Sequence, residues 1–220
     1  MARQVSIGVL ISGSGTNLQA IIDAIEAGKL DAKIEVVLSN KADAYGLVRA
    51  RNHGIAVEVL NHRNFSSRED YDQAVIAVLQ ARGVQLVVLA GFMRLLSPGF
   101  IKTYSNRVMN IHPALLPSFP GLNVQQRAVD HGVRFSGCTV HFVNEECDEG
   151  PIIIQAVVPV FAVDTGETLA ARILEQEHRI YPRAIQLYAE GRLKVVGRKV
   201  LVDRPGKDEQ RALIEPPLET

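Results

Sequence analysis

An amide and an imidazole lie two positions apart in the segment Asn110-Ile111-His112-Pro113. Residues two apart on a β-strand project from the same face, so Asn110 and His112 are expected side by side while Ile111 points the other way. An amide can hold a developing oxyanion, and a histidine can exchange protons near neutral pH. We interpret the pair as a candidate catalytic centre. A buried histidine with an asparagine partner in a core network would give the same pattern.

A glycine-rich turn is the second candidate site. It comprises Ser12, Gly13, Ser14, Gly15, Thr16 and Asn17, between an apolar run and a helical pattern. Unpaired backbone N–H groups in such a turn point outward at the positive end of a helix dipole, which suits a phosphate. The turn lacks the third glycine of a dinucleotide fingerprint and the Gly-Lys-Ser/Thr ending of a triphosphate loop. A monophosphate therefore fits better than either; the alternative is a turn that merely connects strand to helix.

The third candidate is an acidic loop that contains Asn144, Glu145, Glu146, Cys147, Asp148 and Glu149. Most loops of this composition are simply solvated. This loop, however, follows a predicted strand that carries Thr139 and His141 on one face, and it turns directly into the next apolar strand. A carboxylate fixed there is expected to face His112, to favour the imidazolium and to accept a proton in turn.

The spacing of apolar residues predicts the elements that position these motifs. Apolar runs alternate with helical patterns, which is typical of a parallel sheet with helices on both faces and right-handed crossovers. We expect an α/β fold: a Rossmann-like, mostly parallel twisted sheet that ends in a C-terminal antiparallel strand pair. Strands are predicted at residues 5–11, 34–38, 56–60, 86–90, 107–112, 138–143 and 152–161, and helices at 18–27, 44–52, 68–82, 124–130 and 168–189.

Composition excludes several classes of function. The 220 residues include 24 basic and 24 acidic side chains, so the formal net charge is zero and supplies no field for polyanions. We therefore expect no nucleic acid partner. The longest apolar runs fall far short of the ~20 residues of a membrane-spanning helix, and the start of the chain does not resemble a signal peptide. We expect no membrane association and a cytoplasmic location.

The two cysteines, Cys138 and Cys147, lack the paired spacing of a zinc site, and reducing cytosol disfavours a disulfide. We expect ordinary thiols and no metal. Residues 1–202 are predicted to form a single domain, and residues 203–220 a charged, proline-rich and flexible tail.

Six segments give the motifs a common interpretation. They occur in order over most of residues 8–183 and read SGSGTNLQ, SNKADAYGL, LAGFMRLLS, NIHPALLPSFPG, GCTVHFVNEECDEGPII and QEHRIYP. Together they closely resemble the phosphoribosylglycinamide formyltransferase family of purine synthesis. The resemblance implies a formyltransferase fold and transfer of a formyl group from the cosubstrate 10-formyltetrahydrofolate to the amine of glycinamide ribonucleotide. It implies no metal, these two small molecules as partners, and a monomer or homodimer.

The resemblance also implies residue roles. Residues 1–105 would be the ribonucleotide phosphate-binding half, and residues 106–202 the folate-binding and catalytic half. The catalytic residues would be Asn110, His112 and Asp148, with Thr139 and His141 in support. The ribonucleotide would bind Ser12, Gly13, Ser14, Gly15, Thr16, Asn17 and Glu177. The folate would contact Arg68, Met93, Arg94, Leu95, Leu96, Asn110, Val143, Asn144, Glu145, Glu146, Cys147 and Asp148.

In the implied mechanism the substrate amine attacks the formyl carbon, and Asn110 and protonated His112 stabilise the tetrahedral oxyanion. Asp148 pairs with His112 and helps to move protons from the amine to the departing folate nitrogen. Thr139 is expected to hydrogen-bond the Asp148 carboxylate. His141 either supports these groups or packs in the core. The Leu116-Pro117 bond is a candidate cis peptide.

Three other functions are compatible with parts of the pattern. An enzyme that formylates initiator tRNA is expected to carry a further C-terminal domain and a basic surface, and we expect neither. A formyltetrahydrofolate hydrolase is expected to carry a regulatory domain before a first strand that we predict from residue 5. A non-catalytic nucleotide-binding module would not need Asn110, His112 and Asp148 together. We therefore favour the formyltransferase.

Overall fold

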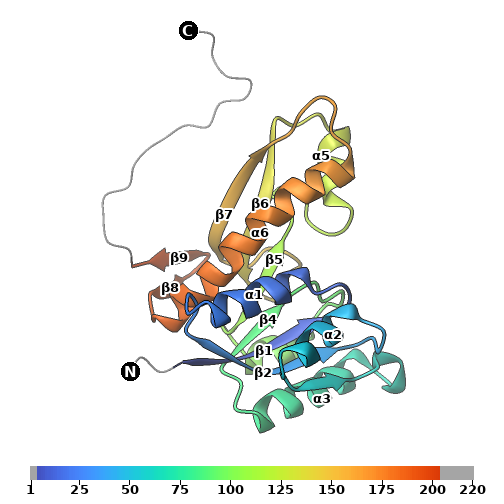
Figure 1. Ribbon diagram of the computed structural model, residues 1–220, viewed down its shortest axis with the longest axis vertical. Coiled ribbons are helices and arrows are strands. Elements are labelled where there is room, and N and C mark those ends of the chain that lie inside the picture. The colour runs from blue at the N-terminus through green and yellow to red at the C-terminus, as the bar shows by residue number, and fades with distance from the viewer. Residues whose placement is uncertain (1–3, 204–220) are drawn as a thin grey trace.

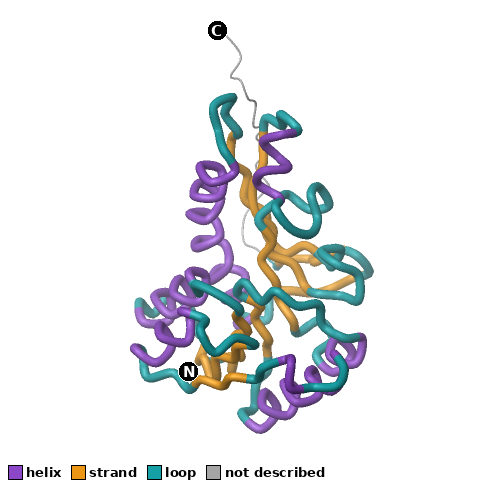
Figure 2. The backbone as a smooth tube through the Cα atoms, turned by 90° about the vertical axis from the view of Figure 1, so that its right-hand side faces the viewer, coloured by secondary structure: helices purple, strands orange, loops and turns teal. Residues whose placement is uncertain are grey.

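A twisted sheet runs through the molecule, with helices on both of its faces (Figures 1 and 2). The structure is a computed structural model that describes residues 4–203. Within that range nine strands have the order β3-β2-β1-β4-β5-β6-β7-β9-β8. They are β1 (Val5–Ile11), β2 (Ala32–Ser39), β3 (Val57–Val59), β4 (Leu86–Leu89), β5 (Val108–His112), β6 (Phe135–Phe142), β7 (Ile152–Pro159), β8 (Leu193–Val196) and β9 (Lys199–Val202).

The helices pack on the two faces of the sheet and form an apolar core with each face. The face covered by α1, α2 and α6 forms one core with the sheet, and α3 and α4 form the other on the opposite face. A third, smaller core joins α5 and the first half of α6 to β6 and β7. The helices are α1 (Thr16–Glu26), α2 (Tyr45–Asn52), the 3-10 turn η1 (His62–Asn64), α3 (Arg68–Ala81), α4 (Pro98–Thr103), α5 (Val124–Asp130) and α6 (Gly166–Ala189).

Local sequence signals explain where several elements begin and end. All four residues of β4 are buried, as a continuous apolar run in a doubly covered sheet requires. Helix α3 begins after Ser67, whose hydroxyl accepts a hydrogen bond from the Asp70 N–H. Helix α6 begins with a reciprocal capping box between Thr165 and Thr168. The helix predicted from residue 168 thus begins two residues earlier, at Gly166, after a cap that was not predicted.

The predicted α/β class, the mostly parallel sheet and the antiparallel pair near the C-terminus are confirmed. Strands β3, β2, β1, β4 and β5 pair in parallel, whereas β6 is antiparallel to both β5 and β7. Three features were not predicted: the 3-10 turn η1, the six-residue helix α4, and the β8–β9 hairpin that closes through Gly197 at φ 59°. All three are too short for apolar periodicity to reveal.

The end of the described chain is held in place. The Asp203 N–H donates to the Arg192 carbonyl at 2.9 Å. The rest of the predicted tail, residues 204–220, lies outside the described residues. None of the helices in residues 4–203 is long and apolar enough to span a membrane.

The topology gathers three loops at one edge of the sheet. The chain leaves β1 toward β2 and β3, then returns to form β4 on the other side of β1, so the strand order reverses between β1 and β4. Ligands bind at such a switch point, outside the carboxyl ends of the strands. The turn of residues 12–17 follows β1, the segment of residues 91–97 follows β4, and β5 ends at His112. The candidate residues therefore meet at this edge.

Candidate functional site

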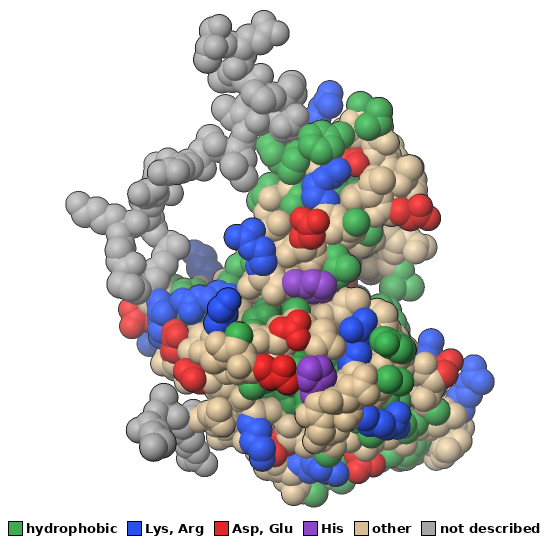
Figure 3. Space-filling view, in the orientation of Figure 1, with side chains coloured by type: hydrophobic (Ala, Val, Ile, Leu, Met, Phe, Trp, Pro, Cys, Tyr) green, Lys and Arg blue, Asp and Glu red, His purple; other side chains and the backbone are tan. Residues whose placement is uncertain are grey.

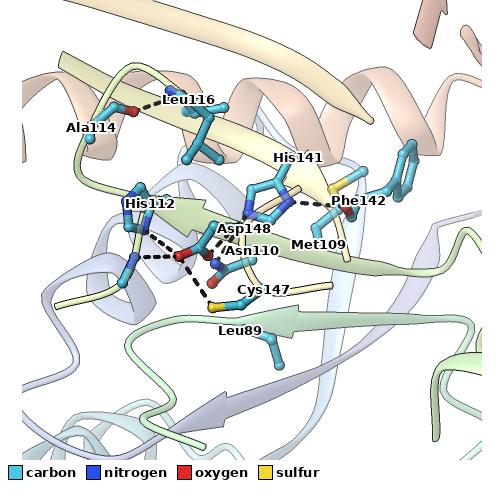
Figure 4. A network of polar contacts seen from close by, with 12 residues as sticks. Leu89, Met109, Asn110, His112, Ala114, Leu116, His141, Phe142, Cys147 and Asp148 are labelled. Atoms are coloured by element: carbon cyan, nitrogen blue, oxygen red, sulfur yellow. Dashed lines mark hydrogen bonds and ion pairs between the residues drawn. The ribbon is translucent and has the colours of Figure 1, made fainter. Parts of the chain in front are cut away.

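Four polar side chains share one face of two paired strands. Asn110 and His112 lie on β5, and the antiparallel register places them opposite His141 and Thr139 of β6. The predicted arrangement of Asn110 beside His112 is confirmed, and both belong to the polar network in Figure 4. His112 and His141 are buried, at 5% and 1% exposure, so their ring nitrogens must find partners within the protein.

Asp148 reaches this face from the loop between β6 and β7. Its Oδ2 lies 3.4 Å from Nδ1 of His112 and accepts a hydrogen bond from the Gly121 N–H at 3.0 Å. Asp148 adopts a left-handed φ of 57°, which asparagine and aspartate tolerate better than most residues. The expectation that a carboxylate of the acidic loop faces His112 is confirmed (Figure 4).

Both ring nitrogens of His112 face oxygen atoms. Nδ1 faces Asp148, and Nε2 lies 2.9 Å from the carbonyl oxygen of Phe119. A neutral imidazole has one N–H donor, whereas the imidazolium has two. Whichever ring nitrogen of His112 carries a hydrogen therefore has an acceptor oxygen facing it.

His141 fixes the orientation of the Asn110 amide. Nδ1 of His141 lies 3.0 Å from the Phe142 carbonyl, so it carries the hydrogen, and Nε2 accepts from Nδ2 of Asn110 at 3.3 Å. Burial lowers the pKa of His141, which keeps the ring neutral. Its Nε2 is 3.9 Å from Oδ1 of Asp148, too far for a hydrogen bond. His141 thus supports Asn110, whose amide carries a second N–H for another acceptor.

Thr139 braces the chain after His112 and does not bond the acid. Its hydroxyl donates to the Ala114 carbonyl at 2.7 Å and accepts from the Leu116 N–H and from Nε2 of Gln155, both at 3.0 Å. The expectation that Thr139 hydrogen-bonds Asp148 is therefore wrong, because three backbone and amide partners already occupy its hydroxyl. The Leu116-Pro117 bond within the braced segment, the candidate cis peptide of the sequence, is cis.

The turn of residues 12–17 is tied to the segment that follows β4. The Ser12 N–H donates to the Gly91 carbonyl at 3.0 Å, and the Ser12 hydroxyl accepts from the Met93 N–H at 2.9 Å. The same hydroxyl donates to Oδ1 of Asn40 at 2.7 Å. Gly13 and Ser14, at the middle of the turn, are exposed. The turn is thus held at its base and open at its tip, as an anion-binding turn must be.

Helix α2 packs against this turn backbone to backbone. Gly15 has φ 70°, and a Cβ there would lie 2.6 Å from the Cα of Gly46. A Cβ on Gly46 would in turn lie 2.6 Å from Cδ1 of Ile11. The Gly46 N–H donates to the Gly13 carbonyl at 3.0 Å. Glycine is required at position 15 by its positive φ and by this backbone contact, while a side chain at position 46 would displace Ile11.

Helix α6 brings an acid to the same turn. The Glu177 carboxylate accepts a hydrogen bond from Nδ2 of Asn17 at 2.7 Å, and both residues are buried. Burial raises the pKa of Glu177, while the Asn17 hydrogen bond opposes that effect. One turn later, the Tyr181 hydroxyl lies 3.0 Å from the carbonyls of both Leu89 and Met109. Helix α6 therefore contacts the turn, the end of β4 and the first part of β5.

The residues expected to contact a folate form two groups. Met93 and Leu95 are 66% and 61% exposed, so the segment after β4 presents apolar side chains to solvent. Arg94 of this segment stacks on Tyr71, with its guanidinium carbon 5.0 Å from the ring centroid, and its buried Nε has no partner among the described residues. Leu96 and Val143 pack against the core of α3 and α4, while Asn144, Glu145, Glu146 and Cys147 lie in the loop that carries Asp148.

Arg68 stands apart from these groups. It begins α3, and its exposed guanidinium contacts Glu69 at 3.3 Å. The contacts of Arg68 thus give it no link to the catalytic face. Cys138 and Cys147 are both free thiols, as expected. Burial raises the pKa of Cys138 to about 12.

Several residues of the site were missed by sequence reasoning. The Phe119 carbonyl and the Gly121 N–H are backbone groups, and their side chains give no signal for this use. Gln155 had a detectable signal, since it is a polar residue within an otherwise apolar strand. Gly46, a glycine near the start of a helix, is also unusual enough to mark a close contact.

The arrangement suits attack by a nucleophile on a carbonyl carbon. An oriented amide and a protonated imidazole can stabilise an oxyanion, and the adjacent carboxylate can take up a proton.

Among the described residues there is no group of three or more His, Cys, Asp and Glu side chains placed to hold a metal ion. Figure 3 shows basic and acidic side chains mixed over one face of the molecule, so this face carries no large patch of one charge.

Known proteins are similar to this chain in sequence. The family model described as "Formyl transferase" matches residues 5–185. Phosphoribosylglycinamide formyltransferase of Escherichia coli (strain K12) is 51% identical over 190 residues, which cover 86% of this chain and 90% of that protein. The trifunctional purine biosynthetic protein adenosine-3 of Homo sapiens is 45% identical over 193 residues, which cover 88% of this chain and 19% of that protein.

Solved structures agree with this similarity. Glycinamide ribonucleotide transformylase 1 from Symbiobacterium toebii has a TM-score of 0.90 and 53% identity, with 92% of this chain and 95% of that chain covered. A formyltetrahydrofolate deformylase from Pseudomonas syringae pv. tomato has a TM-score of 0.85 at 28% identity, with 91% of this chain and 66% of that chain covered.

Proposed function

Because this chain belongs to the formyl transferase family, we propose that it transfers the formyl group of 10-formyltetrahydrofolate to the amine of glycinamide ribonucleotide. The products are the N-formyl ribonucleotide and tetrahydrofolate, in purine biosynthesis. The observation that carries the proposal is the convergence of Asn110, His112 and Asp148 at the carboxyl edge of the sheet. The turn suited to a monophosphate lies at the same edge.

Each of the three residues has a role in the proposed reaction. The amine of the ribonucleotide attacks the formyl carbon, and Asn110 Nδ2 donates to the oxyanion that forms. Nδ1 of His112 faces Asp148, so Nε2 is the nitrogen that donates to the oxyanion, where the Phe119 carbonyl accepts in this structure. Asp148 takes the proton lost by the amine. The bond from carbon to the folate nitrogen then breaks, and that nitrogen receives the proton that Asp148 took from the amine.

The two substrates approach from different sides of this centre. Ser12, Gly13, Ser14, Gly15, Thr16 and Asn17 take the phosphate of the ribonucleotide, and Glu177 contacts the same substrate. The exposed apolar side chains of Met93 and Leu95 and the loop of residues 143–148 take the folate. The assignment of Arg68 to the folate site has less support, because its guanidinium contacts Glu69 and none of the other residues assigned to that site. The protein works in the cytoplasm, where free thiols such as Cys138 and Cys147 persist, as a monomer or homodimer.

A spectroscopic assay tests the function directly. Purified protein is mixed with glycinamide ribonucleotide and 10-formyltetrahydrofolate, and each substrate is omitted in turn. Folate conversion that requires the ribonucleotide is the expected result. Conversion without the ribonucleotide would instead indicate a hydrolase, the activity in the name of the Pseudomonas syringae structure. No conversion in any mixture would contradict both.

Gly13→Val is expected to weaken binding of the ribonucleotide alone. A Cβ at Gly13 meets no atom within 4 Å, so the variant should fold normally. A branched side chain at the exposed tip of the turn nevertheless blocks close approach of a phosphate to the backbone N–H groups. We expect the KM for the ribonucleotide to rise about tenfold or more, with the KM for the folate unchanged. An equal rise in both KM values would contradict the phosphate assignment.

Glu177→Gln is expected to stabilise the fold while it weakens ribonucleotide binding. Burial raises the pKa of Glu177, so the folded state holds its proton more tightly than the unfolded state does. The wild type therefore loses stability as pH rises from the pKa of Glu177 in the unfolded state to its higher pKa in the folded state. The reason is that ionisation of the buried carboxyl opposes folding. Glutamine does not ionise. The stability advantage of the variant should grow over the same pH range.

Urea unfolding between about pH 4 and pH 8 measures this difference. Glu175→Gln is the matched control, since Glu175 is exposed on the same helix and its substitution removes the same charge. A Glu177→Gln variant whose stability relative to the wild type does not change with pH would refute the prediction.

A further inference from the structure

Arg49 lies on α2 with its guanidinium against the glycine turn. Its Nε donates to the Ser14 carbonyl at 2.9 Å, and its Nη1 donates to Oε1 of Gln19 at 3.3 Å. The guanidinium carbon also lies 5.0 Å from the ring centroid of Tyr45. Gln19 is itself held by a 2.8 Å hydrogen bond from Nε2 to Asp23. Partners from the turn, from α1 and from α2 thus fix the half-buried Arg49 side chain.

The Ser14 carbonyl determines where the next N–H points. In a trans peptide unit the C=O of one residue and the N–H of the next lie on opposite sides of the bond. A hydrogen bond that holds the Ser14 carbonyl toward α2 therefore directs the Gly15 N–H away from α2. The Gly46 N–H acts in the same way on the Gly13 carbonyl, at 3.0 Å, and so directs the Ser14 N–H. Both successive N–H groups are oriented by donors on α2.

Successive N–H groups that point to one side form an anion-binding concavity. We propose that Arg49 is a positioning residue for the phosphate of the ribonucleotide, acting through the Ser14 carbonyl. The guanidinium also places a permanent positive charge beside the turn, next to the positive end of α1. This inference rests on the proposed function, since it requires the turn to bind the phosphate.

The test compares Arg49→Ala, Arg49→Lys and the control Arg51→Ala. Arg51 is exposed on the same helix, so its loss removes an equal charge without the contacts to the turn. For Arg49→Ala we expect the KM for the ribonucleotide to rise about tenfold or more, with kcat and the KM for the folate within about twofold of the wild type. Arg49→Lys keeps the charge, but one ammonium cannot hold Ser14 and Gln19 in the fixed plane of a guanidinium. The KM of Arg49→Lys for the ribonucleotide should therefore lie between the KM of Arg49→Ala and that of the wild type.

Three outcomes would overturn the inference. The first is a KM for the ribonucleotide within about twofold of the wild type in both Arg49 variants. The second is an equal rise in the KM for the ribonucleotide and the KM for the folate. The third is a rise in the ribonucleotide KM of Arg51→Ala equal to that of Arg49→Ala. If Arg49→Ala does not fold, Arg49→Lys carries the comparison.

Direct binding separates this inference from the proposed function. Ribose 5-phosphate, a phosphate monoester without the reacting amine, is titrated calorimetrically into each protein. Weaker binding to the Arg49 variants than to the wild type and Arg51→Ala supports the inference even if no formyl transfer is observed. Equal binding to all four proteins overturns it, whatever the assay of activity shows.

Discussion

His112→Ala and Asp148→Asn should each fold normally and lose formyl transfer by orders of magnitude. Removal of one oxyanion donor typically raises the barrier by ~3–4 kcal/mol, or about 100-fold to 1000-fold in kcat. Loss of a positioned proton acceptor has an effect of about 100-fold to 10,000-fold. Asparagine at position 148 keeps an oxygen for the Gly121 N–H and tolerates the left-handed φ of 57°, so the loop should stay in place.

Steady-state kinetics on the purified variants measure the effect, with thermal unfolding as the control for folding. The double variant should be little worse than the more damaging single one, because His112 and Asp148 act as a unit across 3.4 Å. Full activity in either single variant would remove that residue from the mechanism. Losses that multiply in the double variant would show that the two residues act independently.

Gly150→Ala should reduce stability and activity together. A Cβ at Gly150 would lie 1.7 Å from the Phe142 carbonyl oxygen and 2.8 Å from its carbon, both backbone atoms that cannot rotate away. The end of the β6–β7 hairpin must therefore move. The Phe142 carbonyl also contacts Nδ1 of His141, and Asp148 lies two residues before Gly150. The shift consequently reaches both the residue that orients Asn110 and the acid that faces His112.

We expect a loss of about 3 kcal/mol in stability, which lowers Tm by roughly 6–12 °C in a chain of this size. A misplacement of about 1 Å at the catalytic groups reduces kcat about 100-fold. Differential scanning calorimetry and steady-state kinetics measure the two effects. Gly99→Ala is the control, because a Cβ there meets nothing nearer than 3.9 Å in helix α4. A Gly150→Ala variant with the Tm and kcat of the wild type would refute the prediction.

Elements with long apolar patterns and strong caps could be predicted from the sequence. Strand β1 was predicted with its observed bounds, and α3 with its observed first residue and an end one residue beyond the observed one. The pairing of Asn110 with His112 followed from the two-residue period of a strand, and the approach of Asp148 followed from the position of its loop between two strands. These inferences depend on local geometry that side-chain type and spacing determine.

Contacts made by backbone groups could not be predicted. The Phe119 carbonyl and the Gly121 N–H reach the catalytic pair through a segment whose left-handed residues, Phe119 and Asn123, have no distinctive pattern. Thr139 was assigned the wrong partner because a strand pattern gives the face of a side chain but not which of several nearby acceptors it meets. Arg49 was overlooked since a basic residue on a surface helix usually has no specific partner.

Helix α6 belongs to the proposed folate half in sequence but also contacts the proposed ribonucleotide half. Its Glu177 meets Asn17 in the first half, and its Tyr181 hydroxyl lies between the carbonyls of Leu89 in the first half and Met109 in the second. The proposed halves are therefore joined through α6 and do not divide the architecture. A gene fragment that ended after β4 would encode the phosphate turn without its acid, so recombination between related enzymes could exchange loops at this site more readily than halves.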